Sequence, residues 1–333
     1  MFSAEPQRAL APDLAGVAPN SPAGIWWDGI AAGCAWLGAA LLTAGWPNAD
    51  QWDRTREFSM IEGVLGALVF FLALIPRGPA DRIRRLGPWL VVLGIIFAAW
   101  EIVTAKLALL PPPFFAPPQA LLDVYLSDWP RLGESALRSL LLLLSGYAIG
   151  AVLGFVTGIA LGWSRIFGYW AHPLLRFIGP LPATAWLPLA FFIFPTSGSA
   201  STFLVALATG FPVAVLTWSG VASVNSAYYD IARTLGAKER FLVLRIAIPA
   251  ALPHVFVGLF MGLGASFSVL VVAEMLGVKA GLGWYLQWAQ GWASYPNMYA
   301  ALLVMALLFS GLITLLFRTR DRFLAWQRGL VRW

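Results

Sequence analysis

Side chains able to do covalent or metal chemistry are few and scattered in this 333-residue sequence. It has one cysteine, Cys34, and two histidines, His172 and His254, which are far apart. A covalent enzyme needs a nucleophile beside a base, and a metal site needs several ligands that converge. We therefore expect no catalytic residues, no metal site and no disulfide within this chain.

The polar segment 225–249 carries the sharpest pattern. Asn225 or Ser226 can cap a short helix that Gly236 would end, and a second short helix would begin near Lys238. Pro249 marks the start of the next apolar run. Helices of about ten residues are not stable alone in water, so this pair needs a surface on which to dock.

The two short helices would present an apolar ridge with a charged rim. Their apolar residues are Tyr228, Tyr229, Ala232, Leu235, Phe241 and Leu244, and their polar ones include Arg233, Lys238, Glu239 and Arg240. An apolar centre with a charged rim is typical of protein interfaces. The segment is therefore predicted to dock on a partner protein.

Isolated charges also lie in or near apolar runs, where an ionisable group is costly and often functional. We expect Glu62 to lie at the membrane interface, and Glu101 and Lys106 to pair or to extend toward the outer surface. Arg138 lies near the outer end of its run and could attract an anion. Glu274 is a candidate for a gate or pathway residue, with structural pairing as the alternative, and Arg138 and Glu101 are further pathway candidates.

One apolar run carries glycine at every fourth position. These glycines are Gly146, Gly150, Gly154, Gly158 and Gly162. Residues four apart share one helix face, so a neighbouring backbone can approach closely there. The pattern predicts tight helix packing, with a sliding or hinging surface as the alternative; Gly258 and Gly262 suggest a second such face.

The elements that position these residues follow from the composition, which is 59% hydrophobic and 11% charged. A hydrocarbon core about 30 Å thick needs roughly 20 apolar residues per helix, and backbone in lipid must be hydrogen-bonded internally. The expected fold is an all-α polytopic transmembrane bundle. Its eight predicted spans are 25–46, 60–75, 88–108, 135–162, 177–195, 199–224, 250–277 and 298–317.

The basic residues set the expected orientation. The termini and alternate loops hold sixteen of the 22 Lys and Arg residues, and the opposite loops hold four. By the positive-inside rule, both termini and the segment 225–249 are cytoplasmic. Arginines beside the spans anchor topology, so we expect a lipid bilayer rather than nucleic acid as the partner of this basic chain.

Changes in composition predict three parts. Residues 1–24 form a cytoplasmic tail without signal-peptide features. Residues 25–87 form an accessory pair of spans with a basic linker at 76–87, and residues 88–333 form a six-span core.

The segment 225–249 resembles the coupling loop of importer permeases in the binding-protein-dependent ABC class. That motif has Glu-Ala-Ala, three residues, Gly, nine residues, Ile, one residue and Leu-Pro. The matching residues here are Asp230, Ile231, Ala232, Gly236, Ile246, Ile248 and Pro249. The stretches AAWEIV (98–103), PPQALL (117–122), ARTLGA (232–237) and VVAEMLGVKAGLGW (271–284) resemble the nitrate, sulfonate and taurine branch.

The resemblance, which covers about residues 88–333, implies a type I ABC importer permease in a bacterial inner membrane. It implies a second permease chain, cytoplasmic ATPase subunits and a periplasmic binding protein as partners. Asp230, Ile231, Ala232, Arg233, Gly236, Lys238, Arg240, Ile246 and Pro249 would carry the coupling. The sequence has no GxxxxGK[ST] loop, so ATP and Mg²⁺ would be bound by the ATPase and this chain needs no cofactor.

The branch implies a small anion as substrate, such as nitrate, a sulfonate, taurine or bicarbonate. An ion- or proton-coupled secondary transporter is the alternative. That class usually has acidic or broken-helix sites at corresponding places of two repeats, which this sequence does not clearly show.

Overall fold

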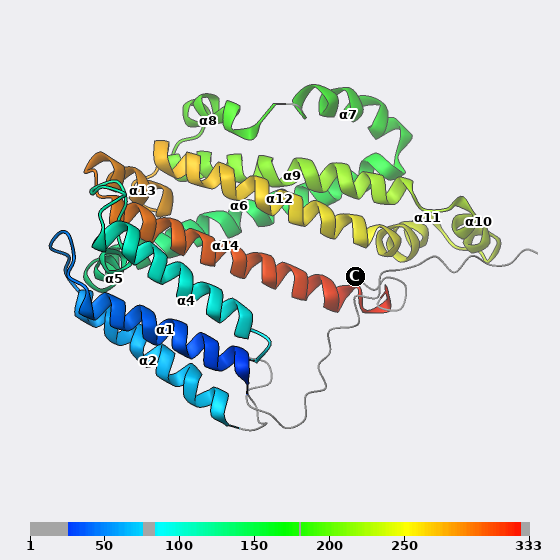
Figure 1. The fold of residues 1–333 in the computed structure, drawn as a ribbon. Coiled ribbons are helices and arrows are strands. Elements are labelled where there is room, and N and C mark those ends of the chain that lie inside the picture. The colour runs from blue at the N-terminus through cyan, green and yellow to red at the C-terminus, as the bar shows by residue number, and fades with distance from the viewer. Residues whose placement is uncertain (1–25, 76–83, 180, 328–333) are drawn as a thin grey trace, which may run out of the picture. The chain divides into compact units, whose positions relative to one another are not determined.

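A computed structural model describes residues 26–75, 84–179 and 181–327, and every regular element in these ranges is a helix (Figure 1). The predicted tail 1–24 lies outside these ranges, as does most of the basic linker. The chain divides into two compact units, residues 1–110 and residues 111–333.

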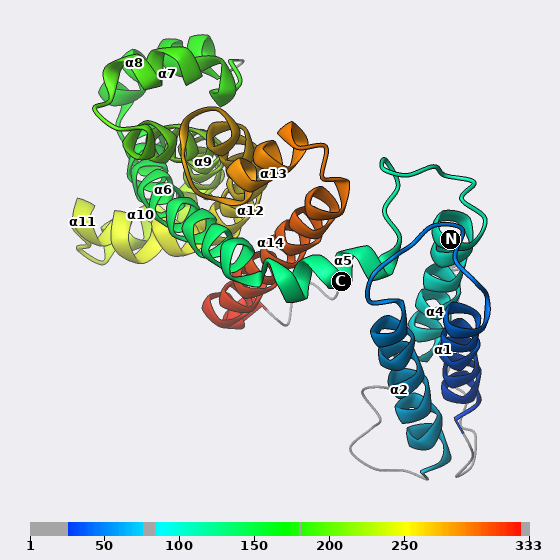
Figure 2. The ribbon, with the colours of Figure 1, turned by 90° about the vertical axis from the view of Figure 1, so that its left-hand side faces the viewer.

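The first unit contains α1 (Trp27–Gly45), α2 (Thr55–Leu74) and α4 (Gly87–Glu101), which continues as a π turn, η2 (Ile102–Lys106). These three helices lie side by side in Figure 2. The Trp36 indole of α1 donates a hydrogen bond to the Leu90 carbonyl of α4 at 3.0 Å. Gly94 of α4 also lies against Trp36, since a β-carbon there would be 3.2 Å from its ring.

The first unit ends at Leu110 and so includes α4, whereas the sequence predicts a boundary after residue 87, before this helix. Composition locates the basic linker, but it does not reveal that α4 packs on α1.

The second unit contains the remaining helices. They are α5 (Pro118–Ser127), α6 (Trp129–Trp163), α7 (Arg165–Ile178), η3 (Ala183–Trp186), α8 (Leu187–Ile193), α9 (Ser197–Ala222), α10 (Ser226–Thr234), α11 (Glu239–Phe241), η4 (Leu242–Ala247), α12 (Ile248–Gly277), α13 (Leu282–Gly291), α14 (Tyr295–Phe323) and η5 (Ala325–Gln327).

Helices α6 and α12 both approach α9 through glycine. All five glycines of the α6 series face α9. A β-carbon at Gly154 would be 2.5 Å from the Gly210 carbonyl oxygen, and one at Gly158 would be 2.5 Å from Thr217 Cβ. β-carbons at Gly258 and Gly262 of α12 would be 3.0 and 3.1 Å from backbone atoms of Val213 and Thr209, two α9 residues that also face the α6 glycines. The glycine faces thus hold three helices at close backbone contact.

Seven helices in the described ranges are long and apolar enough to cross a membrane. The predicted span 177–195 is not one continuous helix, because α7 and the η3–α8 segment meet at 89°. Counting this bent pair as one span gives eight. Pro182 lies between the two segments and disfavours helical backbone at the residue before it, which accounts for a break here.

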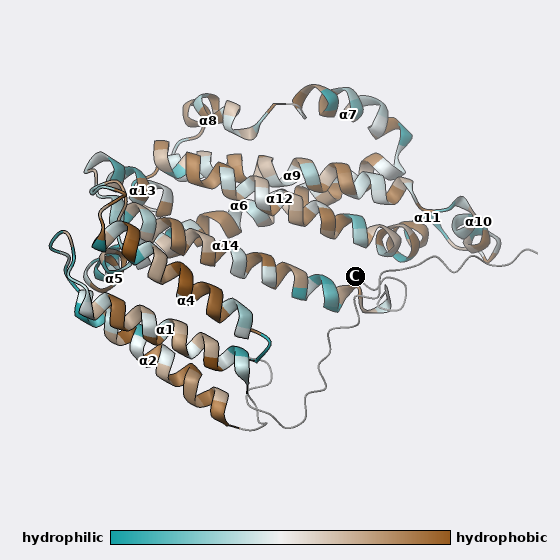
Figure 3. Ribbon diagram, viewed as in Figure 1, coloured by the Kyte–Doolittle hydropathy of each residue, from teal (hydrophilic) through white to brown (hydrophobic). Residues whose placement is uncertain are grey.

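Hydropathy agrees with membrane burial of the long helices. In Figure 3, α4 is mostly brown, whereas hydrophilic residues gather at the C-terminal end of α14. That end contains Arg318, Arg320 and Arg322.

Candidate functional site

Helix α10 is the first arm of the segment 225–249, and its two ends form as the sequence predicts. The Asn225 side chain accepts a hydrogen bond from the Ala227 N–H at 2.9 Å, which caps the helix N-terminus. Gly236 follows the helix with φ at +82°. A β-carbon at Gly236 would meet nothing within 4 Å, so this position favours glycine because of its left-handed backbone and not because of crowding.

The second arm differs from the prediction. It begins at Glu239, after Lys238, and continues through η4 into α12 as one helical stretch, Glu239–Gly277. Pro249 therefore does not separate a short helix from the next span. The π turn η4 ends at Ala247, two residues before Pro249, whose ring and missing N–H do not fit a regular α-helical turn.

Arg233 links the two arms through exposed ion pairs. Its guanidinium lies 3.7 Å from Asp230 on the same helix and 3.5 Å from Glu239 at the start of the second arm. All three side chains are at least half exposed. Exposed ion pairs stabilise a folded protein by about 1 kcal/mol or less. These two pairs therefore add little to the stability of the turn between the arms.

The inner face of the segment packs on the bundle. Ala232 and Leu242 are buried. The Tyr229 ring contacts the Trp163 ring of α6 edge-on, with 5.6 Å between centroids. Burial raises the pKa of the Tyr229 phenol. Tyr229 and Trp163 also pack against a core cluster to which α9 contributes Val221.

The outer face is apolar and open. Tyr228, Ile231 and Leu235 are well exposed, Leu235 by 82%. They line a groove of about 480 Å³ together with Ala232, Arg245, Ile246, Pro249, Ala250 and Trp326. Arg240 lies in the short turn α11, at the base of the second arm. An exposed apolar groove of this kind marks a site of protein interaction.

Glu274, near the C-terminal end of α12, is buried and hydrogen-bonded on both oxygens. It accepts from the Ser139 hydroxyl of α6 at 2.7 and 2.8 Å and from the Gly283 N–H at the start of α13 at 2.8 Å. The Ser139 oxygen accepts in turn from the Leu282 N–H at 2.7 Å. We name this group the Glu274 clamp; its geometry favours structural pairing over a gate.

The other two pathway candidates pair with other residues. Arg138 is exposed and lies 3.4 Å from Glu134, one turn earlier on α6. Glu101 belongs to the first unit, where it pairs with Lys106 at 3.5 Å with both side chains buried. Glu62, which the sequence predicts to lie at the membrane interface, is only 1% exposed within the protein. A hydroxyl partner on α1, Thr43, accounts for its burial.

Sequence reasoning missed Ser139 and Gly281. Ser139 lies seven residues before Gly146, on the buried face that the α6 glycines continue, and this register is a signal that could have found it. Gly281 has φ at +132°, and a β-carbon there would be 2.5 Å from the Glu274 carboxyl carbon.

A family model described as the binding-protein-dependent transport system inner membrane component matches residues 150–328. The chain belongs to this family. Both arms of the segment 225–249 and Glu274 lie inside the matched region, whereas the whole first unit of the permease lies outside it.

Curated relatives agree with this assignment. A probable ABC transporter permease protein from Brucella abortus is 30% identical over 247 residues, which cover 74% of this permease and 98% of the relative. The nitrate import permease protein of Synechococcus elongatus is 27% identical over 262 residues, 75% of this chain and 91% of the relative. The bicarbonate transport system permease protein of the same organism is 30% identical over 199 residues, 59% and 68% of the two chains. The permease is thus a multi-pass membrane subunit whose family implies an ATPase and a substrate-binding protein as partners.

Proposed function

We propose that the permease forms the membrane pathway of an ATP-driven importer in a bacterial inner membrane, with both termini in the cytoplasm. In this proposal the segment 225–249 is the coupling loop, and its exposed groove receives a cytoplasmic ATPase subunit. The observation that carries the proposal is this open apolar groove beside a glycine turn, within the region that matches the family.

The contacts of the coupling loop supply a route for movement. Its second arm is continuous with α12, and Tyr229 of its first arm packs on Trp163 of α6. Val221 of α9 lies in the same cluster as Ala247 and Ala251. A force applied at the groove therefore reaches α6, α9 and α12, which the glycine faces already hold together. Closing of the ATPase pair would shift these helices between two packings, as alternating access requires.

The remaining parts of the importer are partners. Two permease chains, identical or different, would line the pathway, and a periplasmic binding protein would deliver the substrate. ATP and Mg²⁺ would be bound by the ATPase, because the sequence has no phosphate-binding loop. The proposed substrate is a small anion such as nitrate or bicarbonate, with sulfonates and taurine in the same class; the support is the similarity to nitrate and bicarbonate permeases.

The test is reconstitution of the permease with its ATPase and its binding protein in proteoliposomes. We expect ATP hydrolysis and uptake to rise when the binding protein is supplied with one of these anions. Uptake by the permease alone, driven by an ion gradient and without ATP, would contradict the proposal and favour a secondary transporter.

A further inference from the structure

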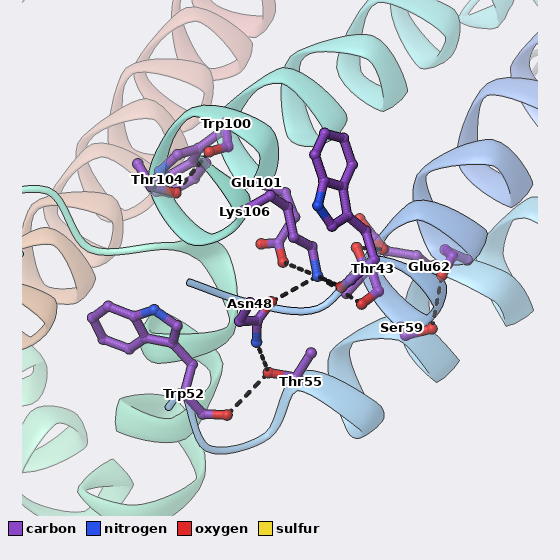
Figure 4. Close-up of polar contacts among 12 residues, drawn as sticks. Thr43, Asn48, Trp52, Thr55, Ser59, Glu62, Trp100, Glu101, Thr104 and Lys106 are labelled. Atoms are coloured by element: carbon purple, nitrogen blue, oxygen red, sulfur yellow. Dashed lines mark hydrogen bonds and ion pairs between the residues drawn. The ribbon is translucent and has the colours of Figure 1, made fainter. Parts of the chain in front are cut away.

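A buried polar cluster occupies the first unit, outside the region that matches the family (Figure 4). Thr43 comes from α1, Glu62 from α2, and Glu101 and Lys106 from α4 and its π turn. Each of these four residues is at most 5% exposed. Two carboxyl groups thus share this buried cluster with one amino group.

Lys106 is present as the charged ammonium. Its Nζ donates to the Thr43 carbonyl at 2.8 Å, to the Trp46 carbonyl at 2.7 Å and to the Asn48 side-chain oxygen at 2.6 Å. Three acceptors around one nitrogen require three N–H donors, which only the ammonium form has. Glu101 Oε1 lies 3.5 Å from the same nitrogen, so one carboxylate balances this charge.

Glu62 is left without a balancing charge. Its Oε2 lies 2.9 Å from the Thr43 hydroxyl, and its Oε1 is buried without a hydrogen-bond partner among the described residues. Among the residues that the structure describes, the charged groups close enough to act on it are Glu101 and Lys106, from α4 and its π turn, while its partner from α1 is the neutral Thr43. If both glutamates were ionised, the cluster would hold a net charge of minus one in an apolar interior, which is strongly unfavourable.

We propose that Glu62 is a proton-binding site of the first unit and carries a proton when this unit is closed. The acid O–H donates to the Thr43 hydroxyl oxygen, since a hydroxyl accepts as well as donates. In the protonated form the buried Oε1 is a neutral carbonyl oxygen without a partner, whereas in the ionised form it would carry part of an unbalanced negative charge. Release of the proton requires water or a cation to reach the cluster, so the protonation of Glu62 is linked to opening of the first unit.

Infrared spectroscopy of the full chain in lipid bilayers at neutral pH tests this site. We expect a carboxylic acid C=O band that shifts in D₂O and is lost in Glu62→Gln. Thr43→Val, or Thr43→Ala if valine does not fit, removes the hydrogen bond to the acid and should move the band to higher frequency. Glu57→Gln changes an exposed carboxylate on the same helix and should leave the band unchanged.

Three results would overturn the proposal. The first is the same acid band in the wild type and in Glu62→Gln. The second is a band that Glu62→Gln removes but the Thr43 variant does not move, because the proton would then reside on Glu101. The third is a Glu62→Gln chain that does not fold, since glutamine has the shape of the neutral acid. This readout needs no transport, so it succeeds or fails independently of the proposed importer function.

Discussion

The Ser139 hydroxyl contacts both carboxylate oxygens of Glu274, at 2.7 and 2.8 Å, although the two residues lie 135 positions apart. This contact fixes α6 to the end of α12. Through the Leu282 N–H, which donates to the Ser139 oxygen, it also fixes the start of α13. One side chain thereby orders three helices.

Ser139→Ala should destabilise the permease. It leaves the buried Leu282 N–H without its acceptor and removes a donor from a buried carboxylate, which costs about 1–3 kcal/mol. The measurement is the free energy of unfolding in detergent, or the shift of the melting temperature. Ser145→Ala is the matched control on α6, because the Ser145 hydroxyl is exposed and bonds its own helix. Equal stability of both variants would contradict the role assigned to the Glu274 clamp.

Gly158→Ala should weaken the contact of α6 with α9. The new β-carbon would be 2.5 Å from Thr217 Cβ, and overpacking of a tight interface costs about 1–3 kcal/mol. Gly133→Ala on the same helix meets nothing within 4 Å and should be neutral or stabilise by up to about 1 kcal/mol. Thermal unfolding of the two variants gives the comparison. A Gly158→Ala variant as stable as Gly133→Ala would show that the glycine face is not tightly packed.

Gly236→Val should abolish substrate-stimulated ATP hydrolysis while membrane insertion stays intact. A left-handed backbone costs an ordinary residue about 1–2 kcal/mol, and a β-branched residue is the least tolerant of it. The turn would therefore change shape and misplace the groove. Gly236→Asn is the control, because asparagine adopts this conformation more readily and should retain more of the stimulation. Normal coupled transport by the valine variant would contradict our placement of the coupling turn.

Leu235→Ser should leave the fold intact but weaken binding of the ATPase. The Leu235 side chain is 82% exposed at the edge of the groove. Its replacement should therefore change the free energy of unfolding of the permease by no more than about 0.5 kcal/mol. Copurification of the ATPase measures binding, and thermal unfolding measures stability.

Leu242→Ser, in the same segment, should instead destabilise the fold of the permease. Leu242 is fully buried, and we expect a loss of stability of several kcal/mol, about 2–5 as for other large-to-small core changes. If Leu235→Ser binds the ATPase as well as the wild type does, the exposed face is not the docking surface.

Local features of the segment 225–249 could be predicted from the sequence because they depend on neighbouring residues. Asn225 caps α10 through the backbone two residues away, and Gly236 takes the left-handed conformation that ends it. The glycine period of four likewise reveals a smooth face on α6, and the motif spacing reveals the family. These signals need no knowledge of the partner helix.

Contacts between distant segments were decided only by the tertiary structure. The sequence could suggest that Glu101 pairs with Lys106 five residues on, but not that Thr43 covers Glu62, nor that Ser139 meets Glu274. An isolated glutamate in an apolar run can be exposed or buried against another helix, and the choice depends on whether that helix offers a hydrogen-bond partner. Composition and spacing therefore determined what this chain is, while helix packing decided which of its charges are buried and which residues hold them.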